Sequence, residues 1–166
     1  METTTLTYRP LATDAEWALA ARIKCDLDYA AVIGGPGSWS EPEVHALYQE
    51  RWGHGEADYQ LKRLREDVAD GELMGFYSGE DLVAFATMRE TNLLADEGPR
   101  LLIVAQIYFL RGETAPDVAR RIAGIADARG IEETDLTIPE AHAEAFVAAG
   151  FQAKVRTMRR TFRPRA

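Results

Sequence analysis

The chain has 166 residues, of which 46% are hydrophobic and 28% charged, and its formal net charge is −8. These proportions are ordinary for a soluble globular protein, so we expect one domain over residues 1–166 with a core of normal size. The negative charge argues against general nucleic-acid binding. No apolar run is long enough for a membrane span, and the first residues lack the plan of a signal peptide, so we expect no membrane partner.

The numbers and positions of cysteine and histidine bear on the cellular compartment and on metal binding. The one cysteine, Cys25, permits no internal disulfide, which favours a cytoplasmic protein, and its place in an apolar-periodic segment indicates a buried thiol. The three histidines are scattered and form no pattern of metal ligands. We therefore expect no metal site.

The N-terminal third begins with the alternating pattern of a strand and continues with helical patterns. Residues 4–9 are rich in Thr and Tyr and predict a strand, which Pro10 ends. Apolar residues at helical spacing predict a helix over 15–31. Two more helices are expected at 41–52 and 57–69, separated by glycine-rich breaks.

From residue 73 the spacing of the apolar residues becomes that of β-strands. Residues 73–78 and 82–90, joined by a turn at 79–81, predict a β-hairpin, and a polar loop is expected at 91–99. The apolar run 101–110 predicts a buried central strand, because it is too short for a membrane span and rich in Ile, Val, Tyr and Phe.

A capped helix is expected to follow this strand. Thr114 is predicted to cap it, with Pro116 in its first turn and Gly130 directly after its end. A strand at 133–138, a short helix at 140–149 and one long or two short strands at 151–162 complete the chain. The fold class is thus α/β, with a central mixed sheet of six to seven strands and helices on both faces.

The turn at residues 111–116 is the first functional candidate. A strand, a tight turn and a helix start leave unpaired N–H groups and a positive helix end at one place, which is typical of a phosphate site. An ordinary strand-to-helix connection uses the same residues, so both interpretations stay open on these residues alone.

Particular residues in this order of elements resemble the GCN5-related N-acetyltransferase (GNAT) family. The resemblance covers nearly the whole chain and is carried by Glu72–Phe76 with Leu82–Ala86, by Ala145–Phe151 and by Met158–Arg160. It implies an acyl-CoA N-acyltransferase fold. It also implies transfer of an acetyl group from acetyl-CoA to the amine of a small-molecule acceptor by direct attack.

The resemblance also implies where the coenzyme binds. Its pyrophosphate is expected on the loop 111–116, and the implied cofactor-binding residues are Ile107, Tyr108, Phe109, Arg111, Gly112, Thr114, Ala115 and Phe146. The loop is a degenerate form of the family pattern, because Glu113 stands where a glycine is usual and Leu110 where a basic residue is usual. Phe146 replaces the family's general-acid tyrosine.

Three residues are candidates for the chemistry. Gln106 and Tyr108 share one face of the expected strand, where Gln106 can orient a water or substrate. Tyr108 is either an acid or a packed aromatic. Histidine is a common general acid or base, so His142 is either catalytic or an ordinary surface histidine.

Tyr29, Trp39 and Tyr48 are the candidate acceptor-binding residues, in an aromatic-rich stretch with glycine breaks. Such a stretch suits a pocket for an apolar or aromatic amine, plain packing, or the contact of a homodimer. Two alternatives to small-amine acetylation remain. One is a GNAT-fold binding module with impaired catalysis, which Glu113 and Phe146 suggest. The other is transfer of a longer acyl group, or transfer to a peptide or protein.

Overall fold

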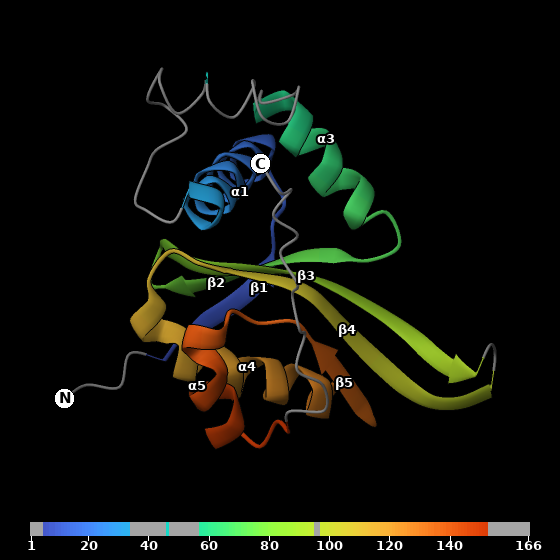
Figure 1. Ribbon diagram of the computed structural model, residues 1–166. Helices are drawn as coiled ribbons and strands as arrows, with labels where there is room; N and C mark the ends of the chain where they lie inside the picture. Colours follow the sequence, from blue (N-terminus) through green and yellow to red (C-terminus); the bar gives the residue numbers. More distant parts are fainter. Residues whose placement is uncertain (1–4, 34–45, 47–56, 95–96, 153–166) are drawn as a thin grey trace, which may run out of the picture.

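A five-stranded mixed sheet with helices on both faces forms the body of the molecule (Figure 1). This computed structural model describes residues 5–33, 46, 57–94 and 97–152. The strands lie side by side in chain order, as β1 (Thr7–Pro10), β2 (Glu72–Ser78), β3 (Asp81–Leu94), β4 (Glu97–Phe109) and β5 (Glu133–Leu136). Each neighbouring pair from β1 to β4 is antiparallel, and β5 runs parallel to β4.

The predicted fold class is confirmed, with fewer strands than expected. The described residues form five strands rather than six or seven. The predicted strand at 151–162 falls almost entirely on residues 153–166, outside the described residues, and 151–152 are not in a strand. The predicted helix at 41–52 also lies outside the described part, apart from the helical residue Ala46.

Helices of the described residues cover both faces of the sheet (Figure 1). On one face lie α1 (Asp14–Ile33) and α3 (Ala57–Asp67), and on the other lie α4 (Ala115–Ala128) and α5 (Ala143–Ala148). Short 3₁₀ turns precede α4 and α5, at η1 (Gly112–Thr114) and η2 (Glu140–His142). Each face has its own apolar core: Met74, Phe76, Val104, Ile122 and Phe146 under α4 and α5, and Leu11, Ala20, Leu64, Phe85 and Tyr108 under α1 and α3.

The predicted polar loop at 91–99 was wrong. Strands β3 and β4 continue through most of it, with Thr91 paired to Leu101 and Asn92 to Arg100. Together they extend past the other strands as a two-stranded ribbon (Figure 1). Thr91 and Asn92 are exposed. Because backbone pairing needs no apolar side chains, a polar composition misled the prediction.

An ion-pair network fastens the end of α4 to the sheet. Arg129, directly after α4, pairs with Glu72 of β2 at 2.6 Å and with Glu90 of β3 at 2.9 Å. Glu90 also pairs with Arg100 of β4 at 2.7 Å. Burial raises the pKa of the Glu90 carboxyl, but the hydrogen bonds from Arg100 and Arg129 outweigh it, so that pKa lies below its ordinary value.

A capping box starts α1 and ties it to β1. The Thr13 hydroxyl accepts a hydrogen bond from the Glu16 N–H at 3.2 Å, and the Glu16 carboxylate accepts from the N–H groups of Thr13 and Ala12 at 3.1 and 2.9 Å. Glu16 also pairs with Arg9 of β1. The hydrogen bond from Arg9, then those from the two N–H groups, lower the Glu16 pKa to about 2.

Replacing Glu16 by Ala should lower the free energy of unfolding by about 1 kcal/mol, the usual value of a helix cap. Because the folded-state pKa is depressed, this stabilisation is complete above the ordinary pKa of 4.5 and is lost as the pH falls through about 2. Urea unfolding of both proteins between pH 7 and pH 2 measures it. Glu66→Ala, which removes an exposed ion pair to Lys62, is the control and should cost less than about 0.5 kcal/mol. A difference between wild type and Glu16→Ala that is constant over this pH range would contradict the assignment.

Candidate functional site

The parallel strands β4 and β5 pair over only part of their length. Residues Leu101–Val104 pair with Glu133–Leu136, and the Thr137 N–H donates to the Val104 carbonyl at 3.1 Å. Beyond this point β4 continues to Phe109, while within the described residues β5 makes no further pair with it. In the described part of the chain, one edge of β4 is therefore open from Ala105 to Phe109.

A β-bulge lies where the two strands part. Thr87 of β3 is opposite Gln106, but the next residue, Met88, is opposite Val104, so Ala105 is the extra residue of β4. Ala105 and Gln106 are both exposed, although Val104 and Ile107 on either side are buried. The bulge thus exposes the middle of a strand that is otherwise part of the core.

The backbone of two residues faces the open edge. The N–H of Leu110 donates to the Val83 carbonyl of β3 at 2.9 Å, so it points away from β5. Because successive N–H groups of a strand alternate in direction, those of Phe109 and Ile107 point to the β5 side. Polar backbone groups on an edge of this kind can pair with another extended molecule.

The open edge leads into the turn η1 and the start of α4. The Thr114 N–H donates to the Arg111 carbonyl at 3.0 Å, and the Ala115 N–H donates to the Gly112 carbonyl. Among the described residues, the N–H groups of Gly112 and Glu113 have no hydrogen-bond partner. Both lie next to the positive end of α4, which is the arrangement that binds an anion.

Thr114 occupies the N-cap position of α4, as predicted, but its side chain makes no capping hydrogen bond. Its hydroxyl donates to the Arg111 carbonyl at 2.6 Å, and α4 begins at Ala115 without a side-chain cap. The reason is the 3₁₀ turn, which bends the chain so that the hydroxyl reaches backward. Pro116 lies in the first turn of the helix, as predicted.

His142 lies against this turn from the other side of the opening. Its ring packs on the Phe109 ring with a centroid separation of 4.4 Å. Its Cε1 atom is 3.0 Å from the position that a Cβ on Gly112 would occupy. Behind it, Phe146 is buried and meets Phe109 edge to face at 6.5 Å. Gly112 therefore allows the close approach of the histidine ring.

The charges around the turn are mixed. Arg111 is exposed and pairs with Asp81 at 3.1 Å, so part of its charge is already neutralised. The exposed Glu113 adds a carboxylate to the turn, and Asp117 in the first turn of α4 pairs with Arg120. The attraction for an anion therefore comes from the unpaired N–H groups and the helix end.

Gln106 and Tyr108 lie together on the opposite face of the sheet. The Tyr108 hydroxyl donates to Gln106 Oε1 at 2.9 Å, and its ring stacks on Phe85 at 4.9 Å. Lys24 of α1 lies over the same ring, 5.8 Å from its centroid. Tyr108 is thus a packed aromatic whose hydroxyl orients Gln106.

The three predicted catalytic residues therefore do not form one cluster. Gln106 and Tyr108 lie on the α1/α3 face, whereas His142 contacts Phe109 on the α4/α5 face. The predicted acceptor residues cannot be placed. Trp39 and Tyr48 lie outside the described residues, and so does the side chain of Tyr29 in α1.

Two residues of the site were missed in the sequence. Ala105 forms the bulge, and Thr87 lies opposite Gln106 with its hydroxyl buried and without a hydrogen-bond partner in the described part of the chain. Neither carries a local signal, because a bulge depends on the register between two strands. Thr87 on its own resembles any strand threonine.

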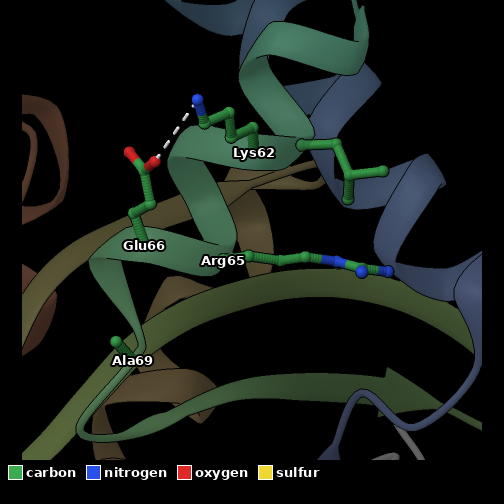
Figure 2. Close-up of a pocket in the computed structure, with 5 residues that line it drawn as sticks. Lys62, Arg65, Glu66 and Ala69 are labelled. Carbon is green, nitrogen blue, oxygen red and sulfur yellow. Dashed lines mark ion pairs between the residues drawn. The ribbon is translucent and has the colours of Figure 1, made fainter.

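A hollow of about 490 Å³ lies elsewhere, on the surface of α3 (Figure 2). It is lined by Leu61, Lys62, Arg65, Glu66 and Ala69, which come from one helix and the turn after it. The Lys62–Glu66 ion pair lies on one side, and Arg65 points away toward Asp14 of α1, to which it bonds at 3.0 Å (Figure 2). None of the predicted site residues lines it.

The described residues show neither a metal-binding cluster nor a membrane-spanning helix. They contain no group of three or more His, Cys, Asp and Glu side chains that could hold a metal ion. No helix among them is both long enough and apolar enough to cross a membrane.

Solved structures share the overall fold of this chain. A transcriptional regulator from Bacillus halodurans superimposes with a TM-score of 0.59, at 16% identity over 95% of this chain and 99% of the other. A GNAT family acetyltransferase from Staphylococcus aureus gives 0.57, at 8% identity over 95% and 99%. A predicted acetyltransferase from Clostridium acetobutylicum, solved with acetyl-CoA, gives 0.54, at 14% identity over 94% and 96%.

The chain has the GNAT fold. The resemblance seen in the sequence is thereby confirmed at the level of fold. No family model and no curated protein matches the chain in sequence. Identities this low establish the architecture, so the activity has to be inferred from the site.

Two glycine replacements test the contact between Gly112 and His142. Gly124→Ala, in an exposed and open position of α4, should stabilise the protein by about 0.5–1 kcal/mol. Gly112→Ala should give no such gain, because its Cβ would displace the His142 ring. Thermal unfolding measures the stabilities, and the NMR signal of the His142 Cε1–H reports the displacement. An unmoved signal in Gly112→Ala would show that the ring is not in contact.

Proposed function

We propose that this protein is an acyl-CoA-dependent N-acetyltransferase that acts on a small-molecule amine. The observation that carries the proposal is the open edge of β4, which runs directly into a turn with two unpaired N–H groups at the start of α4. An extended arm joined to a diphosphate matches this arrangement, because the arm can lie along the strand edge and the diphosphate can accept from the N–H groups of the turn. The acetyl-CoA bound to the Clostridium acetobutylicum protein of the same fold supports that choice of ligand.

The residues of the turn fit a diphosphate. The N–H groups of Gly112 and Glu113 are free to donate, and Gly112 has no Cβ to keep a ligand at a distance. Arg111, Thr114 and Ala115 form the rest of the turn. The exposed carboxylate of Glu113 is solvated, so its repulsion of the diphosphate is screened.

The open edge fits the amide-bearing arm of the coenzyme. The N–H groups of Ile107 and Phe109 face it, whereas Tyr108 contributes only backbone because its side chain packs on the other face. Phe146 is fully buried and supports the Phe109 ring from behind. A backbone N–H of this edge is also the natural donor to a developing oxyanion.

The acceptor amine is assigned to the α1/α3 side of the bulge. Acetyl-CoA supplies the thioester carbonyl that the amine attacks directly. Gln106 is exposed there, and since its Oε1 accepts from Tyr108, its Nε2 amide is directed elsewhere and can orient the acceptor. Phe146 cannot donate a proton, so the proton that the attacking amine loses passes through water to the thiolate, which leaves as the free thiol of CoA.

Isothermal titration with acetyl-CoA and with free CoA tests the first half of the proposal. We expect micromolar dissociation constants that rise with salt, because the contacts are to phosphate. Lys62→Ala, in the hollow on α3, is the matched control and should leave both constants unchanged. Absence of binding at millimolar ligand would overturn the enzyme assignment and leave a binding module of the same fold.

A screen of amines with acetyl-CoA and longer thioesters, read by release of free thiol, tests the second half. With the best acceptor, Gln106→Ala should raise the acceptor KM about tenfold through loss of one oriented hydrogen bond, while the dissociation constant of CoA stays the same. If Gln106→Ala raised the acceptor KM and the dissociation constant of CoA equally, the placement of the two ligands on opposite sides of β4 would be contradicted. Turnover only with longer thioesters or with peptides would redefine the substrates.

A further inference from the structure

His142 makes close contacts to the proposed phosphate turn, although the sequence suggested a catalytic role for it. We propose that His142 is a coenzyme-binding residue, whose imidazole donates a hydrogen bond to the diphosphate held at Gly112 and Glu113. This inference rests on the proposed function, because it names a further residue for the same ligand.

The geometry places the imidazole beside the turn. Its Cε1 lies 3.0 Å, and its Nε2 3.7 Å, from where a Cβ of Gly112 would be. The ring is held there by packing on Phe109 at 4.4 Å, and Phe109 is in turn held by Phe146. His142 is carried by η2, which follows β5, so it approaches the turn from the opposite side of the opening.

The ring has a polar edge that is still free to bind a ligand. Within the described residues, the His142 side chain makes no hydrogen bond and no ion pair, and it is only half-buried. The guanidinium group of Arg111 in the turn is already paired with Asp81. A ring N–H next to two backbone N–H groups adds a third donor, which a diphosphate with several acceptor oxygens can use.

The same geometry argues against a catalytic role for His142. Gln106 and Tyr108, on the proposed acceptor side, lie on the α1/α3 face, whereas His142 packs on the α4/α5 face against Phe109. A general base must reach the proton that it removes, directly or through one water. The imidazole instead lies beside the turn at the far end of the open edge.

Two substitutions separate the polar edge of the ring from its packing. His142→Phe keeps an aromatic ring on Phe109 but removes both ring nitrogens, and His142→Gln keeps a donor without the ring. Titration calorimetry with CoA, with ADP as a diphosphate probe and with S-acetylpantetheine as a probe without phosphate measures each protein. Thermal unfolding checks that both variants are folded.

We expect His142→Phe to weaken CoA and ADP binding about tenfold, the effect of one hydrogen bond to a charged group, and His142→Gln to lose less than about threefold. S-acetylpantetheine should bind equally to all three proteins. CoA affinity of His142→Phe equal to or tighter than wild type would overturn the inference while the proposed function stands. An equal loss for S-acetylpantetheine would also overturn it, because packing would then be responsible. If wild type binds neither CoA nor ADP, the proposed function itself fails.

Discussion

The parting of β5 from β4 after Val104 is the constraint on which the rest of the site depends. Within a closed sheet, the N–H groups of Ile107 and Phe109 would pair with a neighbouring strand. Here the bulge at Ala105 and the end of pairing at Leu136 leave them on an open edge. A polar edge beside a buried strand is costly unless water or a ligand satisfies it. The same feature that interrupts the sheet therefore supplies a binding edge.

Beside this opening, each face of the sheet carries its own group of site residues. Under α4 and α5, the rings of Phe109, Phe146 and His142 form one contiguous group next to the turn at Gly112. Under α1 and α3, Tyr108 holds Gln106 by its hydroxyl. β4 contributes to both groups because its side chains alternate. The ion pairs of Arg129 connect the far end of α4 to β2 and β3.

Two departures from the family pattern take on physical meaning in this arrangement. Glu113 is exposed, so its carboxylate is solvated, and its backbone N–H remains available to the turn. Phe146 is almost fully buried between Phe109 and Phe151, where a tyrosine hydroxyl would need a partner. The position that would hold a general acid thus contributes apolar packing instead.

The sequence by itself determined the features that depend on neighbouring residues. The apolar strand before residue 110, the helix with Pro116 in its first turn, and the helix ends at Gly130 and Gly150, both with positive φ, follow from local propensity and glycine chemistry. Only the tertiary structure decided the bulge at Ala105, the extended β3–β4 ribbon, the backward hydrogen bond of Thr114 and the place of His142. Each of these depends on the register between strands or on a contact between segments far apart in the chain, and no local pattern encodes such a contact.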